Sequence, residues 1–175
     1  LQDFGTATMI SVGLVANNFV IQSADRISID ESGKAYMNPN GNGVRISYKK
    51  PNGRNGEVYY FQQNLADEKL QAAPGFMRFM EQIPFDTAYY KAASYVPQMG
   101  DFNIVNNFVM NTVNHVVQND DGLPFRAFKA QAAKWDLKIF GVYTRPDKQF
   151  GAGPHLGLVI GHAPRSTQAN SQREQ

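Results

Sequence analysis

Residues 43–61 read GVRISYKKPNGRNGEVYYF, and this stretch decides the fold class. Val44, Ile46 and Tyr48 alternate with polar residues, a pattern typical of a strand with one buried and one wet face. The segment PNGRNG at 51–56 supplies residues that tolerate a positive φ, and VYYF then resumes extended structure. The sequence therefore predicts a β-hairpin here.

Strands are expected on both sides of this hairpin, and helices mainly after it. The apolar or alternating segments predict strands over 8–15, 19–30, 135–143 and 155–162. Three- and four-residue spacing predicts helices over 65–70, 74–80, 87–95 and 102–117. Asn64 is the expected cap of the first helix and Asp101 that of the last. Strands at both ends and helices between them predict an α+β fold, with an antiparallel or mixed sheet and helices packed on one face.

The composition is that of a folded protein domain. The chain has 175 residues, of which 42% are hydrophobic, enough for a sizeable core. We expect one domain over 1–163, either complete or the C-terminal part of a longer protein, and a flexible tail over 164–175. The sequence contains no cysteine, which excludes disulfides and thiolate chemistry. No apolar run is long enough to predict a transmembrane segment.

The charge is balanced, with 17 basic and 15 acidic residues. The densest basic spot is Lys49, Lys50 and Arg54, beside the predicted hairpin turn. A nucleic-acid-binding protein usually concentrates its positive charge in a larger patch, so we interpret these three as a solvated hairpin end and expect no nucleic-acid partner.

One enzymatic interpretation starts near the N-terminus. Residues 5–28, GTATMISVGLVANNFVIQSADRIS, resemble the opening of proteasome-type N-terminal nucleophile hydrolases. The resemblance implies an amide hydrolase with Thr8 as nucleophile, Asp25 as the group that tunes it and Lys34 as its lysine. Thr8 would become the N-terminus only after cleavage behind Ala7, and the glycine-rich segment of that family is replaced by a loop rich in Asn, Pro and Gly.

His115, Asp120 and Asp121 are candidates for a metal site, because imidazole and carboxylates bind divalent cations. The NDDG segment at 119–122 is also typical of a turn after a helix, and residues 123–125 offer no side-chain oxygen. We therefore assign no metal and no cofactor.

Several segments between 43 and 150 resemble a family of uncharacterised bacterial proteins that are exported or associated with the cell envelope. The segments that carry the likeness are GVRISYKK, VYYFQQNLADEKL, PGFMRFMEQ, YYKAASY, VVQNDDGLPFRAF and WDLKIFGVYTRP. The resemblance implies an exported protein, in the periplasm, at the cell surface or secreted. It attaches no activity to any residue.

The favoured hypothesis is a non-enzymatic binding or assembly component of a bacterial envelope or secreted system, with the threonine hydrolase as the alternative. A protein partner or the subunits of an assembly are expected, with a small molecule or a glycan as a further ligand class. The predicted binding residues flank the 102–117 helix and are Lys91, Ser94, Tyr95, Gln118, Asp120, Asp121 and Arg126.

Overall fold

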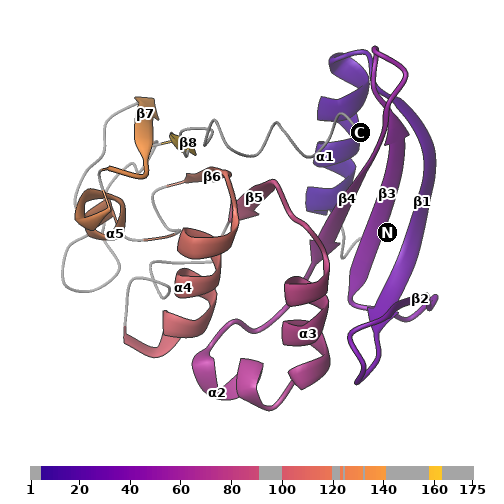
Figure 1. Ribbon diagram of the computed structural model, residues 1–175. Helices are drawn as coiled ribbons and strands as arrows, with labels where there is room; N and C mark the ends of the chain where they lie inside the picture. The colour runs from indigo at the N-terminus through magenta and orange to yellow at the C-terminus, as the bar shows by residue number, and fades with distance from the viewer. Residues whose placement is uncertain are drawn as a thin grey trace, which may run out of the picture. The chain divides into compact units, whose positions relative to one another are not determined.

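The computed structural model describes residues 5–90, 100–119, 123, 125–131, 133–140 and 158–162 (Figure 1). They belong to two compact units. The first comprises the chain up to Asn64 together with Ala73–Gln82, and the second comprises Leu65–Ala72 and the chain from Ile83 onward. Each unit contains helices and a four-stranded sheet, which confirms the α+β class. The predicted domain boundaries at 1 and 163 stay a prediction.

The first unit is built on an antiparallel sheet in the order β2-β1-β3-β4. Its elements are α1 (Gly5–Ala16), β1 (Val20–Ile29), β2 (Ala35–Met37), β3 (Gly43–Lys49), β4 (Asn55–Phe61) and α3 (Pro74–Gln82). The predicted hairpin is confirmed as β3 and β4, which pair from Gly43 with Phe61 to Lys49 with Asn55. The strand expected at 19–30 is confirmed as β1, and the helix expected from Pro74 is confirmed as α3.

Aromatic rings attach α3 to this sheet. Phe61 packs edge-on against Phe76 and Phe79, with ring centroids 5.5 and 5.3 Å apart, and Tyr59 lies 5.2 Å from Phe79. A glycine allows the helix to approach the turn after β1, because a Cβ on Gly75 would lie 2.1 Å from the carbonyl oxygen of Asp30. Part of the core of this unit thus forms between α3 and the sheet face that carries Phe61 and Tyr59, and the fully buried Ile46 lies on the other face of the sheet.

The strand predicted over 8–15 is wrong, because these residues form most of α1. The segment is apolar on all sides, so its periodicity does not distinguish a buried strand from a helix. Asn17 and Asn18 end the helix as expected of a turn, with Asn18 at φ 61° and the Asn17 side-chain amide donating to the carbonyl oxygen of Gly13.

The second unit has a mixed sheet in the order β5-β6-β8-β7. Its elements are α2 (Asp67–Gln71), β5 (Thr87–Tyr90), the 3-10 turn η3 (Gly100–Phe102), α4 (Asn103–Thr112), β6 (His115–Asn119), α5 (Phe125–Ala130), β7 (Asp136–Phe140) and β8 (Leu158–His162). Strand β5 runs parallel to β6, whereas β8 is antiparallel to both β6 and β7. Its buried hydrophobic residues include Leu70, Val105, Val109, Met110, Val116, Phe128 and Trp135.

One helix prediction in this unit is wrong over its described part, and another is confirmed but too long. Residues 87–90 form β5 instead of a helix, and the helix expected over 102–117 ends at Thr112. The carbonyl oxygen of Asp86 accepts hydrogen bonds from the backbone N–H groups of Asn114 and His115, which starts β6 beside β5. Sheet pairing therefore overrides the helical spacing. The short helix α5 was not predicted.

The helix caps also differ from the prediction. The helix α2 is preceded by Ala66 rather than capped by Asn64, and Asp101 lies in η3. The carboxylate of Asp67 accepts hydrogen bonds from the backbone N–H groups of Asn103 and Ile104, at 3.1 and 2.8 Å. A residue in α2 thus satisfies the N-terminus of α4, as a local N-cap usually does.

The strands expected near the C-terminus are confirmed over 136–140 and 158–162. Residues 141–143, 155–157 and the predicted tail at 164–175 lie outside the described residues. In the described part of the chain, no helix has the length and apolar character that crossing a membrane requires.

Candidate functional site: a polar array on the first sheet

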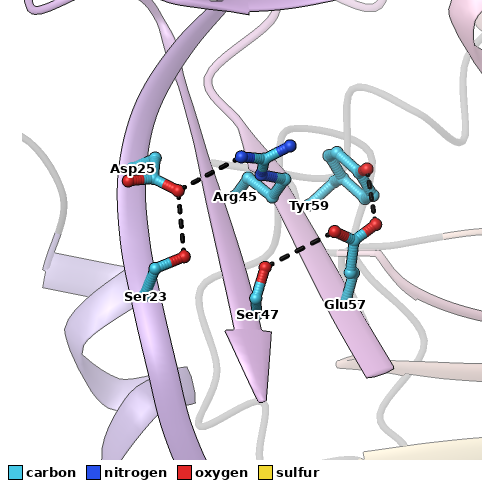
Figure 2. A network of polar contacts seen from close by, with 6 residues as sticks. All are labelled: Ser23, Asp25, Arg45, Ser47, Glu57 and Tyr59. Carbon is cyan, nitrogen blue, oxygen red and sulfur yellow. Dashed lines mark hydrogen bonds and ion pairs between the residues drawn. The ribbon is translucent and has the colours of Figure 1, made fainter. Parts of the chain in front are cut away.

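Six polar side chains form an array on one face of the first sheet (Figure 2). Strand β1 contributes two of them, β3 two and β4 two, and the polar array consists of Ser23, Asp25, Arg45, Ser47, Glu57 and Tyr59. Strand register makes two rows across the sheet: Asp25 pairs with Arg45 and Arg45 with Tyr59, while Ser23 pairs with Ser47 and Ser47 with Glu57. Because side chains two residues apart share a face, the six lie together.

Hydrogen bonds hold both carboxylates of the array. Asp25 accepts a hydrogen bond from the Ser23 hydroxyl at 2.9 Å and pairs with Arg45 Nη2 at 3.3 Å. Glu57 accepts one from the Tyr59 hydroxyl at 2.8 Å and one from the Ser47 hydroxyl at 3.4 Å. The array is therefore ordered by its own contacts, on three strands that fix its backbone.

Arg45 lies at the centre of the array. Its hydrogen bond with the Asp25 carboxylate is the main reason that the pKa of the guanidinium is raised above its usual value. A guanidinium carries five N–H donors, and in the described residues its hydrogen bond to Asp25 is formed by Nη2. The Nε atom is buried and has no hydrogen-bond partner within that part of the chain. Arg45 is thus a fixed cation with one buried N–H that lacks an acceptor in the described residues, and its side chain is 35% exposed.

Tyr59 contributes a donor that stays protonated. Burial raises the pKa of its phenol to about 12, and the hydrogen bond to Glu57 adds to the effect. A general acid or base works best with a pKa near the working pH. The Tyr59 hydroxyl therefore suits binding better than proton transfer.

The array was not predicted as a site. Arg45 and Ser47 were recognised only as the wet face of the hairpin, and Asp25 only as part of the hydrolase interpretation. The sequence signal that could have identified the array is the alternation of polar residues along each strand. Such residues share one face of the sheet, and the register then decides which of them are neighbours.

The residues of the hydrolase interpretation lie in different settings. Thr8 is inside α1, whereas the resemblance implied a threonine at the start of a strand. Asp25 is held in the polar array, and Lys34 follows the turn after β1, where its backbone N–H donates to Asp30 Oδ1 at 2.9 Å. The strand–turn–strand arrangement on which that interpretation depends is replaced by a helix, a turn and a strand.

Of the predicted binding residues, Gln118 is the one whose side chain the structure describes. It is 2% exposed, its Nε2 donates to the carbonyl oxygen of Leu123 at 2.8 Å, and its Oε1 accepts from the N–H of Leu123 at 2.9 Å. Gln118 is therefore buried and fixes the chain after β6 through both ends of its amide. The backbone of Arg126 belongs to α5. The other predicted binding residues lie outside the described residues, and they are Lys91, Ser94, Tyr95, Asp120 and Asp121.

The imidazole of His115 contacts the carboxylate of Asp86, which is not one of the two aspartates considered for a metal site. Its Nδ1 lies 3.2 Å from Asp86 Oδ2, and Asn114 Nδ2 donates to Asp86 Oδ1 at 2.9 Å. The hydrogen bond from Asn114 is the main cause of a lowered pKa at Asp86, with further contributions from His115. Three or more potential metal ligands do not gather anywhere in the described residues, and Asp120 and Asp121 lie outside them.

The lowered pKa of Asp86 makes a prediction about acid stability. Because the folded state favours the carboxylate, this contribution is present above the unfolded-state pKa and is lost as the pH falls through the folded-state pKa. We expect wild type to be more stable than Asp86→Asn at about pH 6, with the gap closing as the pH falls below the ordinary aspartate pKa of about 3.9. Urea unfolding across that range measures the gap. A gap independent of pH would contradict the assignment, and Asp136→Asn, another exposed carboxylate, is the control.

Comparisons with known proteins identified no relative of this chain. No family model, no curated protein and no solved structure matches the chain. The functional argument therefore depends on the residues themselves.

Proposed function

We propose that this protein is a non-enzymatic binding component of an assembly, and that the polar array is the surface that contacts its protein partner. The observation that carries the proposal is Arg45, a fixed and partly exposed cation at the centre of an ordered polar surface, whose buried Nε has no hydrogen-bond partner in the described residues. A buried N–H without an acceptor costs about 1 to 3 kcal/mol. A partner that reorganises the array and supplies an acceptor would recover part of that cost.

The array has the residue types that protein interfaces favour. Arginine and tyrosine are enriched at interface hot spots, and Arg45 and Tyr59 lie in the same row of the array. Since hydrogen bonds already order the side chains, little further rotamer entropy is lost on binding. With one cation and two carboxylates, the array suits a partner that offers backbone carbonyl and N–H groups or a cationic side chain.

The setting that we propose is the bacterial cell envelope or a secreted system. This part of the proposal is supported by the resemblance of segments between 43 and 150 to exported bacterial proteins. Fractionation of the native host tests it by immunodetection, and recovery of the protein with cytoplasmic markers would contradict it.

A charge-neutral double variant tests the surface. Asp25→Asn with Arg45→Gln removes both members of the ion pair together, so neither charge is left unpaired and the net charge of the chain is unchanged. We expect isolation from the native host to recover the partner at least about tenfold less with this variant than with wild type, because hot-spot residues contribute upwards of about 1.4 kcal/mol.

The control removes another pair of one acidic and one basic residue. Glu68 and Lys69 lie 3.1 Å apart on α2, are well exposed, and are outside the polar array. Glu68→Gln with Lys69→Gln is expected to recover the partner as wild type does. Equal recovery with all three proteins would overturn the assignment of the surface. Wild type isolated alone, or with only a small molecule or glycan attached, would overturn the protein partner.

A further inference from the structure

The helix α1 has three exposed apolar residues, spaced three positions apart in the sequence. Met9, Val12 and Val15 are 55% to 68% exposed, and the three positions lie within an arc of about 120°. Its sequence, GTATMISVGLVA, contains no charged residue. Exposed helix surfaces of soluble domains normally carry charged or polar residues, so this face is unusual.

The apolar face adjoins the basic end of the hairpin. The helix ends at Ala16, and Val20, itself 63% exposed, pairs in register with Lys49. Lys50 and Arg54 close the turn between β3 and β4 at the same end of the sheet, where the Lys50 N–H donates to the Arg54 carbonyl oxygen at 2.7 Å. Figure 1 shows the end of α1 and this turn side by side.

The three cations are not neutralised locally. No ion pair to Lys49, Lys50 or Arg54 occurs in the described residues, and the sequence from Val44 to Gly56 contains no acidic residue. Lys49 and Arg54 are exposed, and Lys50 is half-buried. An uncharged apolar face beside uncompensated cations is complementary to a surface that is apolar beneath an anionic layer.

We propose that α1 and the basic hairpin end together bind the surface of an anionic lipid bilayer. Met9, Val12, Val15 and Val20 would enter the boundary between headgroups and acyl chains, while Lys49, Lys50 and Arg54 meet the lipid phosphates. Each cation near an anionic membrane surface strengthens binding by about fivefold, so the three together contribute on the order of a hundredfold. The two features act as the paired signals that stable peripheral binding requires.

Vesicle co-sedimentation of the full chain tests this proposal. Vesicles of phosphatidylcholine alone are compared with vesicles containing about one-third phosphatidylglycerol. We expect wild type to bind the anionic vesicles much more tightly, and to lose most of that preference as salt is raised. Lys49→Gln/Lys50→Gln/Arg54→Gln should lower the affinity for anionic vesicles by roughly a hundredfold.

Two further variants separate the contributions. Met9→Gln/Val12→Gln/Val15→Gln should weaken binding to both kinds of vesicle. Lys34→Gln/Lys69→Gln/Lys138→Gln removes three exposed lysines elsewhere and should bind anionic vesicles more tightly than the hairpin variant. Circular dichroism checks that each variant is folded.

Three results would overturn the proposal. One is wild type that stays in solution with anionic vesicles, and another is equal loss of binding in the hairpin variant and its lysine control. The third is wild type that does not bind lipid but self-associates in analytical ultracentrifugation, when substitution of the α1 residues abolishes the self-association. The apolar face of α1 would then bind a second copy of the chain. None of these results bears on the polar array, so this inference and the proposed function can fail separately.

Discussion

Phe79→Ala is expected to destabilise the first unit by about 3 to 5 kcal/mol, the usual cost of truncating a buried phenylalanine. Phe79 is 2% exposed, and its ring packs edge-on against Phe61 and Tyr59. The truncation removes these contacts and leaves a cavity between α3 and the sheet. Because a small domain is stable by only about 5 to 15 kcal/mol, this is a large fraction of the total.

Chemical denaturation measures the change, and hydrogen exchange localises it to β3 and β4. Tyr36→Ala is the matched control, since Tyr36 is an aromatic residue of the same sheet but 48% exposed. We expect the control to shift the unfolding free energy by no more than about 0.5 kcal/mol. Equal effects of the two variants would contradict the position of Phe79 in the core.

Gln118→Leu is expected to destabilise the second unit by about 2 to 5 kcal/mol, because it leaves two buried backbone groups of Leu123 without partners. Leucine has a similar volume but can neither donate to the Leu123 carbonyl oxygen nor accept from its N–H. Denaturation of the variant measures the loss. Gln71→Leu, an exposed glutamine on α2, is the control and should be nearly neutral.

Gln118→Glu distinguishes the hydrogen bonds from the volume of the side chain. A protonated carboxyl can both donate and accept, whereas a carboxylate can only accept. This variant should therefore lie closer to wild type in acid than at neutral pH. A Gln118→Leu variant as stable as wild type would instead show that Gln118 is free for the ligand role first predicted for it.

The elements predicted correctly are those with strong local signals. The β3–β4 hairpin combines alternating side chains with turn residues, and α3 combines proline at its first position with apolar spacing. Both signals act within a few residues, so no distant partner is needed to interpret them.

The incorrect predictions concern elements whose structure depends on residues far apart in the sequence. Residues 87–90 belong to a stretch whose sequence predicts a helix, yet they form β5 because they pair with β6 from Thr87 opposite His115. The N-terminus of α4 is satisfied by Asp67, which lies 36 residues from Asn103. The polar array depends in the same way on the register of three strands, which sets Arg45 between Asp25 and Tyr59.

A native mass spectrum of the wild-type protein, isolated gently from its native source, tests the central claim most directly. The account predicts a second polypeptide at fixed stoichiometry, and the loss of that polypeptide with Asp25→Asn/Arg45→Gln but not with Glu68→Gln/Lys69→Gln. A spectrum of the bare chain, or a second polypeptide that the double variant retains, would contradict it.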